Sequence, residues 1–299
     1  DYYIGDLSTS VDPKLINSVK ESDQILVVGA RLGEMTTGGY TTIKPNKKSK
    51  IIHVYPDKKE LGKVYKPIIG IKANSSIFSK MIKDKKIKNI QWERWSNSCR
   101  KNYIEYSTPP KYSSEPDMGK IMLILREYMP KNTIITIDAG NFSGWIQRFW
   151  KYTQVKTQLA PTSGAMGYSI PAAISAKIAK KSTPVIAFCG DGGFMMSSQE
   201  LATCNQFKIK PIIVIINNKM LGTIRMHQEK HYPKRKIATD LVNPDFKVLS
   251  KSYNAHYENI KNHKQFLKAL KRSIAANKAA VIEIEVDPQQ ITTRQKMKD

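Results

Sequence analysis

Cysteine is scarce in this sequence. The 299 residues contain three cysteines, Cys99, Cys189 and Cys204, and their spacing matches no metal-binding pattern. A set so sparse and odd in number excludes a disulfide-stapled scaffold. We therefore expect a protein of a reducing compartment, with the cytoplasm as the default location.

Long apolar runs are also absent. No stretch reaches the roughly 18 residues that a membrane-spanning helix needs, and no secretory signal opens the sequence. We therefore expect no membrane partner. Hydrophobic residues make up 40% of the chain, which is too much for a disordered protein. The length is that of about two ordinary domains.

Acidic residues are few relative to basic ones. The 25 Asp and Glu face 49 Lys and Arg, which gives a formal net charge of +24. Such a charge often marks a nucleic-acid partner. Here, however, the lysines are scattered in short groups, such as Lys47 with Lys48 and Lys86 with Lys88, without a basic stripe that carries interleaved aromatics. We predict no nucleic-acid partner and interpret the charge as a lysine-rich solvated surface.

Short apolar runs alternate with amphipathic stretches, which is typical of an α/β fold. The expected strands cover residues 24–29, 50–57, 132–140, 183–190, 210–218 and 280–286. The polar, proline-bearing stretch 107–117 is the expected linker between a domain at 1–106 and another at 118–299. We predict two parallel-sheet, three-layer α/β domains.

Helix starts carry their own signals. Asp12-Pro13 combines a capping residue with a first-turn proline. Ser197 followed by Glu200 forms a capping-box pattern and predicts a helix that begins near Ser197. Asn243-Pro244 predicts a helix with Asn243 as its cap.

Two polar motifs follow successive strands of the second domain. Gly190-Asp191-Gly192-Gly193 ends one strand, and Asn217-Asn218 ends the next. In a right-handed βαβ unit both loops emerge at the same carboxyl edge, where open α/β sheets bind ligands. Carboxylate and amide oxygens suit Mg²⁺, whereas glycine N–H groups and the helix near Ser197 suit an anion. A diphosphate bridged by Mg²⁺ would satisfy both, although each motif taken singly is more typical of a plain turn.

Several motifs in order carry a family resemblance. "GDGGFMMSSQELATCNQF" followed by "PIIVIINNKMLGTIRMHQ" resembles the thiamine-diphosphate signature. "SDQILVVGARLGEMTTGG" and "IIHVYPDKKELGK" resemble the central domain of the acetolactate synthase and benzoylformate decarboxylase family, and "DAGNFSGWIQRFW" and "SGAMGYSIPAAISA" resemble the start of its diphosphate-binding domain. The resemblance covers nearly the whole chain. It implies a thiamine-diphosphate- and Mg²⁺-dependent decarboxylase or carboligase that acts on a 2-oxo acid.

The resemblance also implies a set of site residues. Asp191 and Asn218 would bind Mg²⁺ through their side chains and Met220 through its carbonyl. Met166 would be the apolar wedge that bends the cofactor, and its N–H together with the carbonyl of Gly164 would hold the aminopyrimidine. The expected diphosphate contacts are Asn141, Phe142, Gly190, Gly192, Gly193, Leu221 and Gly222.

One part of the family's machinery has no counterpart in the sequence. The activating glutamate of the family lies in an N-terminal pyrimidine-binding domain, and no glutamate here matches it. We therefore expect the chain to be inactive by itself, either as a fragment of a longer enzyme or as one subunit of a split one. Because the family's cofactor spans a subunit interface, we expect a homodimer or tetramer.

Substrate and second cofactor stay open. His227 stands where acetolactate synthases usually carry a tryptophan, and His227 and His231 are either acid–base groups or surface residues. The stretch 223–241 is a candidate closing lid. "GARLGEMTTGG" resembles a region that lines FAD in the family but lacks the paired acidic residues after the arginine, so FAD binding is doubtful.

Two other classes of function remain at this point. A plain nucleotide- or anion-binding α/β protein is weakly supported, because the run from Gly29 to Gly33 is not the dinucleotide fingerprint. A basic binding module has only the net charge in its favour.

Overall fold

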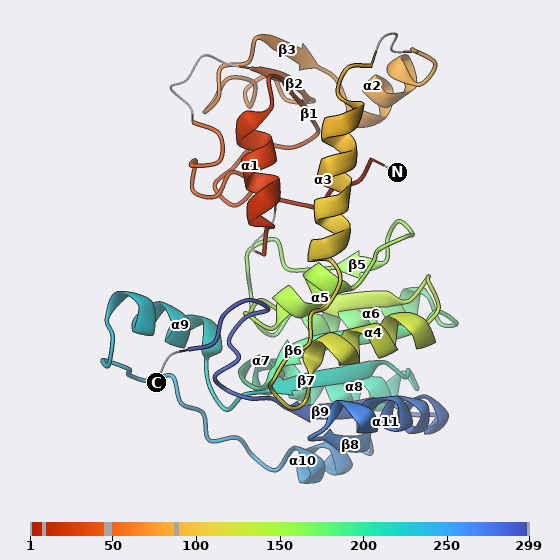
Figure 1. Ribbon diagram of the computed structural model, residues 1–299. Coiled ribbons are helices and arrows are strands. Elements are labelled where there is room, and N and C mark those ends of the chain that lie inside the picture. Colours follow the sequence, from red (N-terminus) through yellow and green to blue (C-terminus); the bar gives the residue numbers. More distant parts are fainter. Residues whose placement is uncertain (1, 8–9, 45–49, 87–89, 298–299) are drawn as a thin grey trace. The chain divides into compact units, whose positions relative to one another are not determined.

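The computed structural model describes residues 2–7, 10–44, 50–86 and 90–297 (Figure 1). Lys47, Lys48 and Lys88 of the scattered basic groups lie outside these ranges. The chain divides into two compact units, Asp1–Thr108 and Pro109–Asp299. Within the described ranges, no helix is both long and apolar enough to cross a membrane.

The first unit contains a three-stranded parallel sheet in the order β1-β2-β3. Its elements are α1 (Pro13–Glu21), β1 (Ile25–Val28), β2 (Ile51–Tyr55), β3 (Ile69–Lys72), α2 (Ser75–Ile82) and α3 (Glu93–Tyr106). Helix α1 begins as predicted, because the Asp12 carboxylate accepts the N–H of Lys14 at 2.9 Å. Strand β3 was not predicted, since it includes Gly70 and is largely exposed.

The second unit contains a six-stranded sheet in the order β5-β4-β6-β7-β9-β8, in which every pair is parallel. The strands are β4 (Ile134–Ile137), β5 (Gln158–Leu159), β6 (Val185–Gly190), β7 (Ile212–Asn217), β8 (His256–Ile260) and β9 (Ala280–Glu285). The central strands are buried on both faces, which explains their continuous apolar sequences. The predicted parallel-sheet α/β class is confirmed. The edge strands β5 and β8 were not predicted, because one is very short and the other polar.

Helices cover both faces of this sheet (Figure 1). One face packs against α4 (Met118–Tyr128), α5 (Ser143–Phe149) and α11 (His263–Ala275). The other packs against α6 (Ser169–Ala179), α7 (Asp191–Ser197), α8 (Leu201–Gln206) and α10 (Phe246–Ser252). Fully buried phenylalanines, among them Phe149 and Phe194, lie in the two cores. The three layers leave the carboxyl edge of the sheet accessible to the loops that follow the strands.

The predicted helix start near Ser197 is wrong. Helix α7 begins at Asp191 and ends at Ser197, and a 3₁₀ turn (Ser198–Glu200) leads into α8. The capping box does not form, because the Glu200 carboxylate accepts the Thr203 hydroxyl at 2.8 Å. Gly192 and Gly193 therefore lie in the first turn of α7 rather than in a separate glycine turn.

The predicted cap of α10 is also wrong. Asp245, not Asn243, caps this helix, because its Oδ1 accepts the N–H groups of Lys247 at 2.8 Å and Val248 at 3.0 Å. Asn243 lies two residues before the cap, and its side chain is directed to a tertiary partner instead.

Candidate active site

The pairing of β6 with β7 brings the two polar motifs together. The strands are parallel, and Gly190 pairs with Ile216. Asp191 follows β6 directly, and Asn218 follows β7. Both residues therefore lie at the carboxyl edge of the sheet, as predicted from the βαβ pattern.

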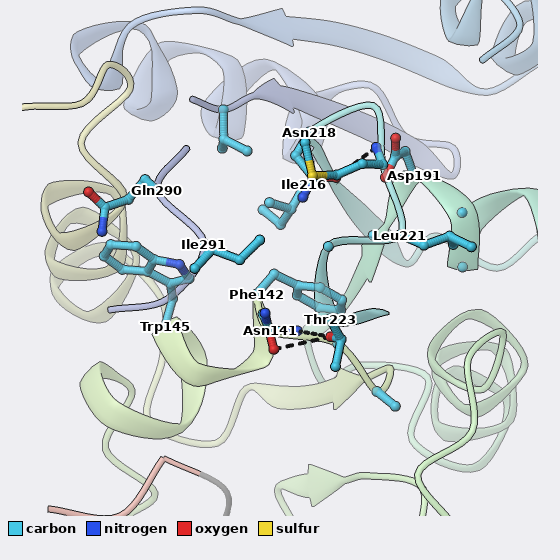
Figure 2. A pocket seen from close by; sticks show the side chains of 18 of the residues that line it. Asn141, Phe142, Trp145, Asp191, Ile216, Asn218, Leu221, Thr223, Gln290 and Ile291 are labelled. Atoms are coloured by element: carbon cyan, nitrogen blue, oxygen red, sulfur yellow. Dashed lines mark hydrogen bonds between the residues drawn. The ribbon is translucent and has the colours of Figure 1, made fainter. Parts of the chain in front are cut away.

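A cavity of about 250 Å³ opens at this edge. All twelve predicted site residues line it: Asn141, Phe142, Gly164, Met166, Gly190, Asp191, Gly192, Gly193, Asn218, Met220, Leu221 and Gly222. Apolar walls are added by Trp145, Ile216 and Ile291 (Figure 2). A mostly apolar cavity with a few convergent polar groups is typical of a small-molecule site.

The Asp191 carboxylate is deeply buried, with 1% of the residue exposed. Its Oδ2 accepts the Asn243 side-chain N–H at 2.7 Å. Among the described residues, no lysine, arginine or histidine forms an ion pair with it. Burial raises the pKa of the Asp191 carboxyl, and the hydrogen bond from Asn243 counteracts part of that rise. A buried anion without a cationic partner is unstable unless something compensates it.

Two further residues with oxygen donors, Asn218 and Met220, line the same cavity as Asp191. The Asn218 Oδ1 accepts the N–H of Met220 at 3.2 Å. Met220 forms an isolated antiparallel bridge with Asp240, but within the described ranges its own carbonyl accepts no backbone hydrogen bond. Carboxylate, amide and carbonyl oxygens form the donor set that Mg²⁺ prefers, so the residues present fit this ion. Clusters of three or more His, Cys, Asp or Glu do not occur in the described part of the chain.

Asn141 joins the loop after β4 to helix α9 (Gly222–His231). Its N–H donates to the Thr223 Oγ1 at 3.0 Å, and the Thr223 hydroxyl donates to the Asn141 Oδ1 at 3.1 Å (Figure 2). A Cβ on Gly222 would lie 2.8 Å from the Asn218 Nδ2. The start of α9 therefore packs tightly against both Asn141 and Asn218, and a side chain at position 222 would displace the Asn218 amide.

Met166 lies in the segment 164–169, which we call the wedge loop. The flanking Gly164 and Gly167 have φ values of +68° and +77°, a region that L side chains rarely adopt. The Met166 Cε lies 3.3 Å from the position that a Cβ on Gly192 would take, so the side chain reaches the first turn of α7. Within the described ranges, the N–H of Met166 and the carbonyl of Gly164 have no backbone partner. Both groups are thus available to a ligand.

Two side chains next to the site were missed by the sequence analysis. Asn243 was interpreted as a helix cap, yet it donates to Asp191 at 2.7 Å and to Asn217 at 3.2 Å. Asp138 follows β4 in the same way that Asp191 follows β6. Its position directly after a strand could have marked Asp138 as a candidate site residue. No pattern in the sequence marks Asn243 in this way.

The two histidines lie outside the cavity. His227 and His231 are exposed on α9, and their rings stack with centroids 6.1 Å apart. The predicted lid 223–241 covers α9 from its second residue onward and the segment that returns after it. The Arg225 side chain pairs with Glu229 within α9 and with Asp240 in the returning segment, each at 3.1 Å. Closure of this segment stays a prediction.

The FAD prediction concerns the first unit. There, a groove past the carboxyl ends of β2 and β3 is lined by Arg31, Tyr55, Pro56, Asp57, Lys58, Lys59 and Lys72. Its basic side chains suit an anionic ligand of many kinds, so FAD binding stays a prediction.

Comparison with known families accounts for both units. Residues 1–82 match the central domain of thiamine pyrophosphate enzymes, and residues 138–284 match their C-terminal TPP binding domain. The chain belongs to the thiamine pyrophosphate enzyme family. This membership confirms the resemblance seen in the sequence.

Individual relatives of this thiamine pyrophosphate family member are acetolactate synthases. The probable acetolactate synthase large subunit of Methanocaldococcus jannaschii is 32% identical over 286 residues, which cover 91% of this chain and 47% of the relative. The acetolactate synthase large subunit of Lactococcus lactis is 30% identical, over 84% of this chain and 44% of the relative. The isozyme 2 large subunit of Escherichia coli is 25% identical and covers 96% and 52%. The chain thus spans about half the length of the curated relatives it matches.

Proposed function

We propose that this chain is the cofactor-binding part of a thiamine-diphosphate- and Mg²⁺-dependent decarboxylase or carboligase, similar to acetolactate synthase, that acts on a 2-oxo acid. One observation carries the proposal. The buried Asp191 carboxylate, which has no ion-pair partner among the described residues, lies in the same cavity as Asn218, Met220 and the wedge loop. The names of the relatives support the 2-oxo acid.

Each part of the cavity has a distinct task in this proposal. Asp191 and Asn218, with the Met220 carbonyl, hold Mg²⁺, and the N–H groups of Gly192 and Gly193 orient the diphosphate. The remaining proposed diphosphate contacts are Asn141, Phe142, Gly190, Leu221 and Gly222. The wedge loop holds the aminopyrimidine through the Met166 N–H and the Gly164 carbonyl. When bound, thiamine diphosphate supplies the nucleophilic carbon and the electron sink for loss of CO₂.

The proposal extends to assembly and location. We infer a homodimer or tetramer, and a cytoplasmic protein on the basis of three free, buried cysteines. FAD is a further candidate ligand, whose test is binding to the first unit.

Tryptophan fluorescence tests the proposed cofactor directly. Trp145 lines the cavity and is 3% exposed, so a ligand that fills the cavity should quench it. We expect saturable quenching by thiamine diphosphate with Mg²⁺, and affinity weaker by about tenfold or more with EDTA, because the diphosphate then lacks its bridging cation. Thiamine and ADP serve as comparison ligands. Absent quenching by thiamine diphosphate, or an equal response to ADP, would favour a nucleotide-binding protein instead.

The 299-residue chain is expected not to turn over pyruvate by itself. The family activates its cofactor with a glutamate, and the described residues that line the cavity include no glutamate. The measurement is CO₂ release from pyruvate with thiamine diphosphate and Mg²⁺ present. Turnover by the isolated chain would contradict the expectation and would call for another activating group.

Asn243→Ala should weaken Mg²⁺ binding by about 10- to 100-fold, the usual cost of losing a partner that orients a metal ligand. The reason is that the Asn243 amide donates to the Asp191 Oδ2 at 2.7 Å. The measurement is the Mg²⁺ dependence of quenching at a fixed thiamine diphosphate concentration. Asn259→Ala is the matched control, since Asn259 also donates to a carboxylate, that of Glu285 at 2.8 Å, but on edge strand β8. If the two variants weaken Mg²⁺ binding equally, Asn243 has no specific role in the proposed cation site.

A further inference from the structure

Asp138 is a second buried carboxylate at the carboxyl edge of the sheet. It is 2% exposed, and no ion pair reaches it from the described residues. Its Oδ1 accepts the N–H of Ser169 at 2.5 Å, and its Oδ2 accepts the N–H of Gly167 at 2.9 Å. Burial raises the pKa of the Asp138 carboxyl, whereas these N–H donors act in the opposite direction. Because each oxygen already accepts a backbone N–H, Asp138 is bound to the wedge loop.

Other groups at the end of β4 bind the same loop. The Thr136 hydroxyl donates to the Ser169 carbonyl at 2.7 Å, and the Ala139 N–H donates to the Ala165 carbonyl at 3.1 Å. Residues 165, 167 and 169 are therefore each fixed by β4 or by the residues that follow it. Met166 lies between two of these anchored positions.

Helix α7 packs on the other side of the carboxylate. A Cβ on Gly193 would lie 2.4 Å from the Asp138 Oδ2, and a Cβ on Gly167 would lie 3.0 Å from that of Met196. The carboxylate is therefore enclosed between the wedge loop and the first turns of α7. A side chain held so closely can set the distance between these two segments.

We propose that Asp138 is a positioning residue that fixes the wedge loop, and thereby the backbone groups around Met166, against the cavity. The identity of the ligand rests on the proposed function, which this inference deepens. Asp138 hydrogen-bonds to the half of the cavity assigned to the aminopyrimidine. The cation is assigned instead to Asp191 and Asn218, and the diphosphate to the N–H groups in the first turn of α7. Loss of Asp138 should therefore weaken binding of the aminopyrimidine while it leaves binding of the cation and the diphosphate nearly unchanged.

Asp138→Asn is the central variant. It keeps the shape of the side chain but replaces one acceptor oxygen with an N–H₂ group, which faces a backbone N–H. We expect the Gly167 and Ser169 amides of the unliganded chain to exchange with deuterium about tenfold faster. A buried N–H that loses its acceptor destabilises the closed loop, and the loop then opens to solvent about tenfold more often. Thiamine diphosphate with Mg²⁺ should bind about tenfold more weakly. Inorganic pyrophosphate with Mg²⁺, which lacks the aminopyrimidine, should bind within about twofold of its original affinity.

The control is Asp12→Asn, which also removes a buried carboxylate that accepts a backbone N–H, but in the first unit. If Asp138→Asn does not fold, as judged by far-UV circular dichroism, Thr136→Val tests the inference in its place. It removes the hydroxyl bond to Ser169 and keeps the branched shape, and it should speed exchange at Ser169 while leaving pyrophosphate binding intact.

Two results would overturn the inference. One is unchanged exchange at Gly167 and Ser169 in both variants. The other is a parallel loss of thiamine diphosphate and pyrophosphate binding, which would make Asp138 a general support of the fold. Should the original chain bind neither ligand, the proposed function fails, and the exchange rates still decide whether Asp138 holds the wedge loop.

Discussion

Asp191→Ala is expected to abolish the Mg²⁺-dependent quenching by thiamine diphosphate, with an affinity loss larger than the roughly 100-fold that a missing indirect partner costs. The variant removes the only charged side chain among the three proposed cation donors, Asp191, Asn218 and the carbonyl of Met220. The measurement is the fluorescence titration that tests the proposed function. Asp23→Ala is the control, because it removes an exposed carboxylate of the first unit.

The stability of Asp191→Ala sharpens this test. In the absence of Mg²⁺, Asp191 is a buried anion without an ion-pair partner in the described part of the chain. Removing a buried charge that has no partner relieves the cost of its desolvation. We therefore expect the metal-free variant to melt at the same temperature as the original chain or above it. A large fall in melting temperature together with lost binding would mean that Asp191 supports the fold, and the cation site would then be unsupported.

The sequence predicted the site through its topology. Asp191 and Asn218 could be paired because both follow buried strands, and parallel neighbouring strands place their ends at one edge. The same logic could have been extended to Asp138, which follows β4. The topology could not predict which groups Asp138 binds, because the amides that donate to it lie on a loop about 30 residues further along the chain.

Local helix-start signals failed where the polar side chains found other partners. Asn243-Pro244 has the pattern of a helix start, yet Asp245 caps α10 and Asn243 donates to Asp191. Ser197 and Glu200 have the pattern of a capping box, yet Glu200 binds Thr203 and the helix begins at Asp191. Only the first error involves a side chain next to the proposed cation site, where the Asn243 bond spans 52 residues of the chain. The Glu200 bond is local, but it goes to a different partner from the one that the capping-box pattern predicts.

The first turn of α7 offers the last and most quantitative test. Gly193→Ala is expected to destabilise the chain by about 1–3 kcal/mol, the usual cost of overpacking a tight site. An added Cβ would lie 2.4 Å from the Asp138 Oδ2. The carboxylate is buried, and each of its two oxygens accepts one backbone N–H. Alanine is normally the better helix residue by roughly 0.5–1 kcal/mol, so any net loss understates the clash. Urea denaturation gives the free energy of unfolding.

Two further variants isolate the cause of that loss. Gly33→Ala is the control, because no atom lies within 4 Å of its added Cβ and its φ is not positive, so little change is expected. Asp138→Ser in combination with Gly193→Ala removes the carboxylate that the new methyl group would strike. If the clash is the cause, the double variant loses less stability than the sum of the two single variants, since residues in contact couple by about 0.5–3 kcal/mol. Additive losses would show instead that the glycine is required by the backbone of α7, and that Asp138 and α7 do not constrain each other.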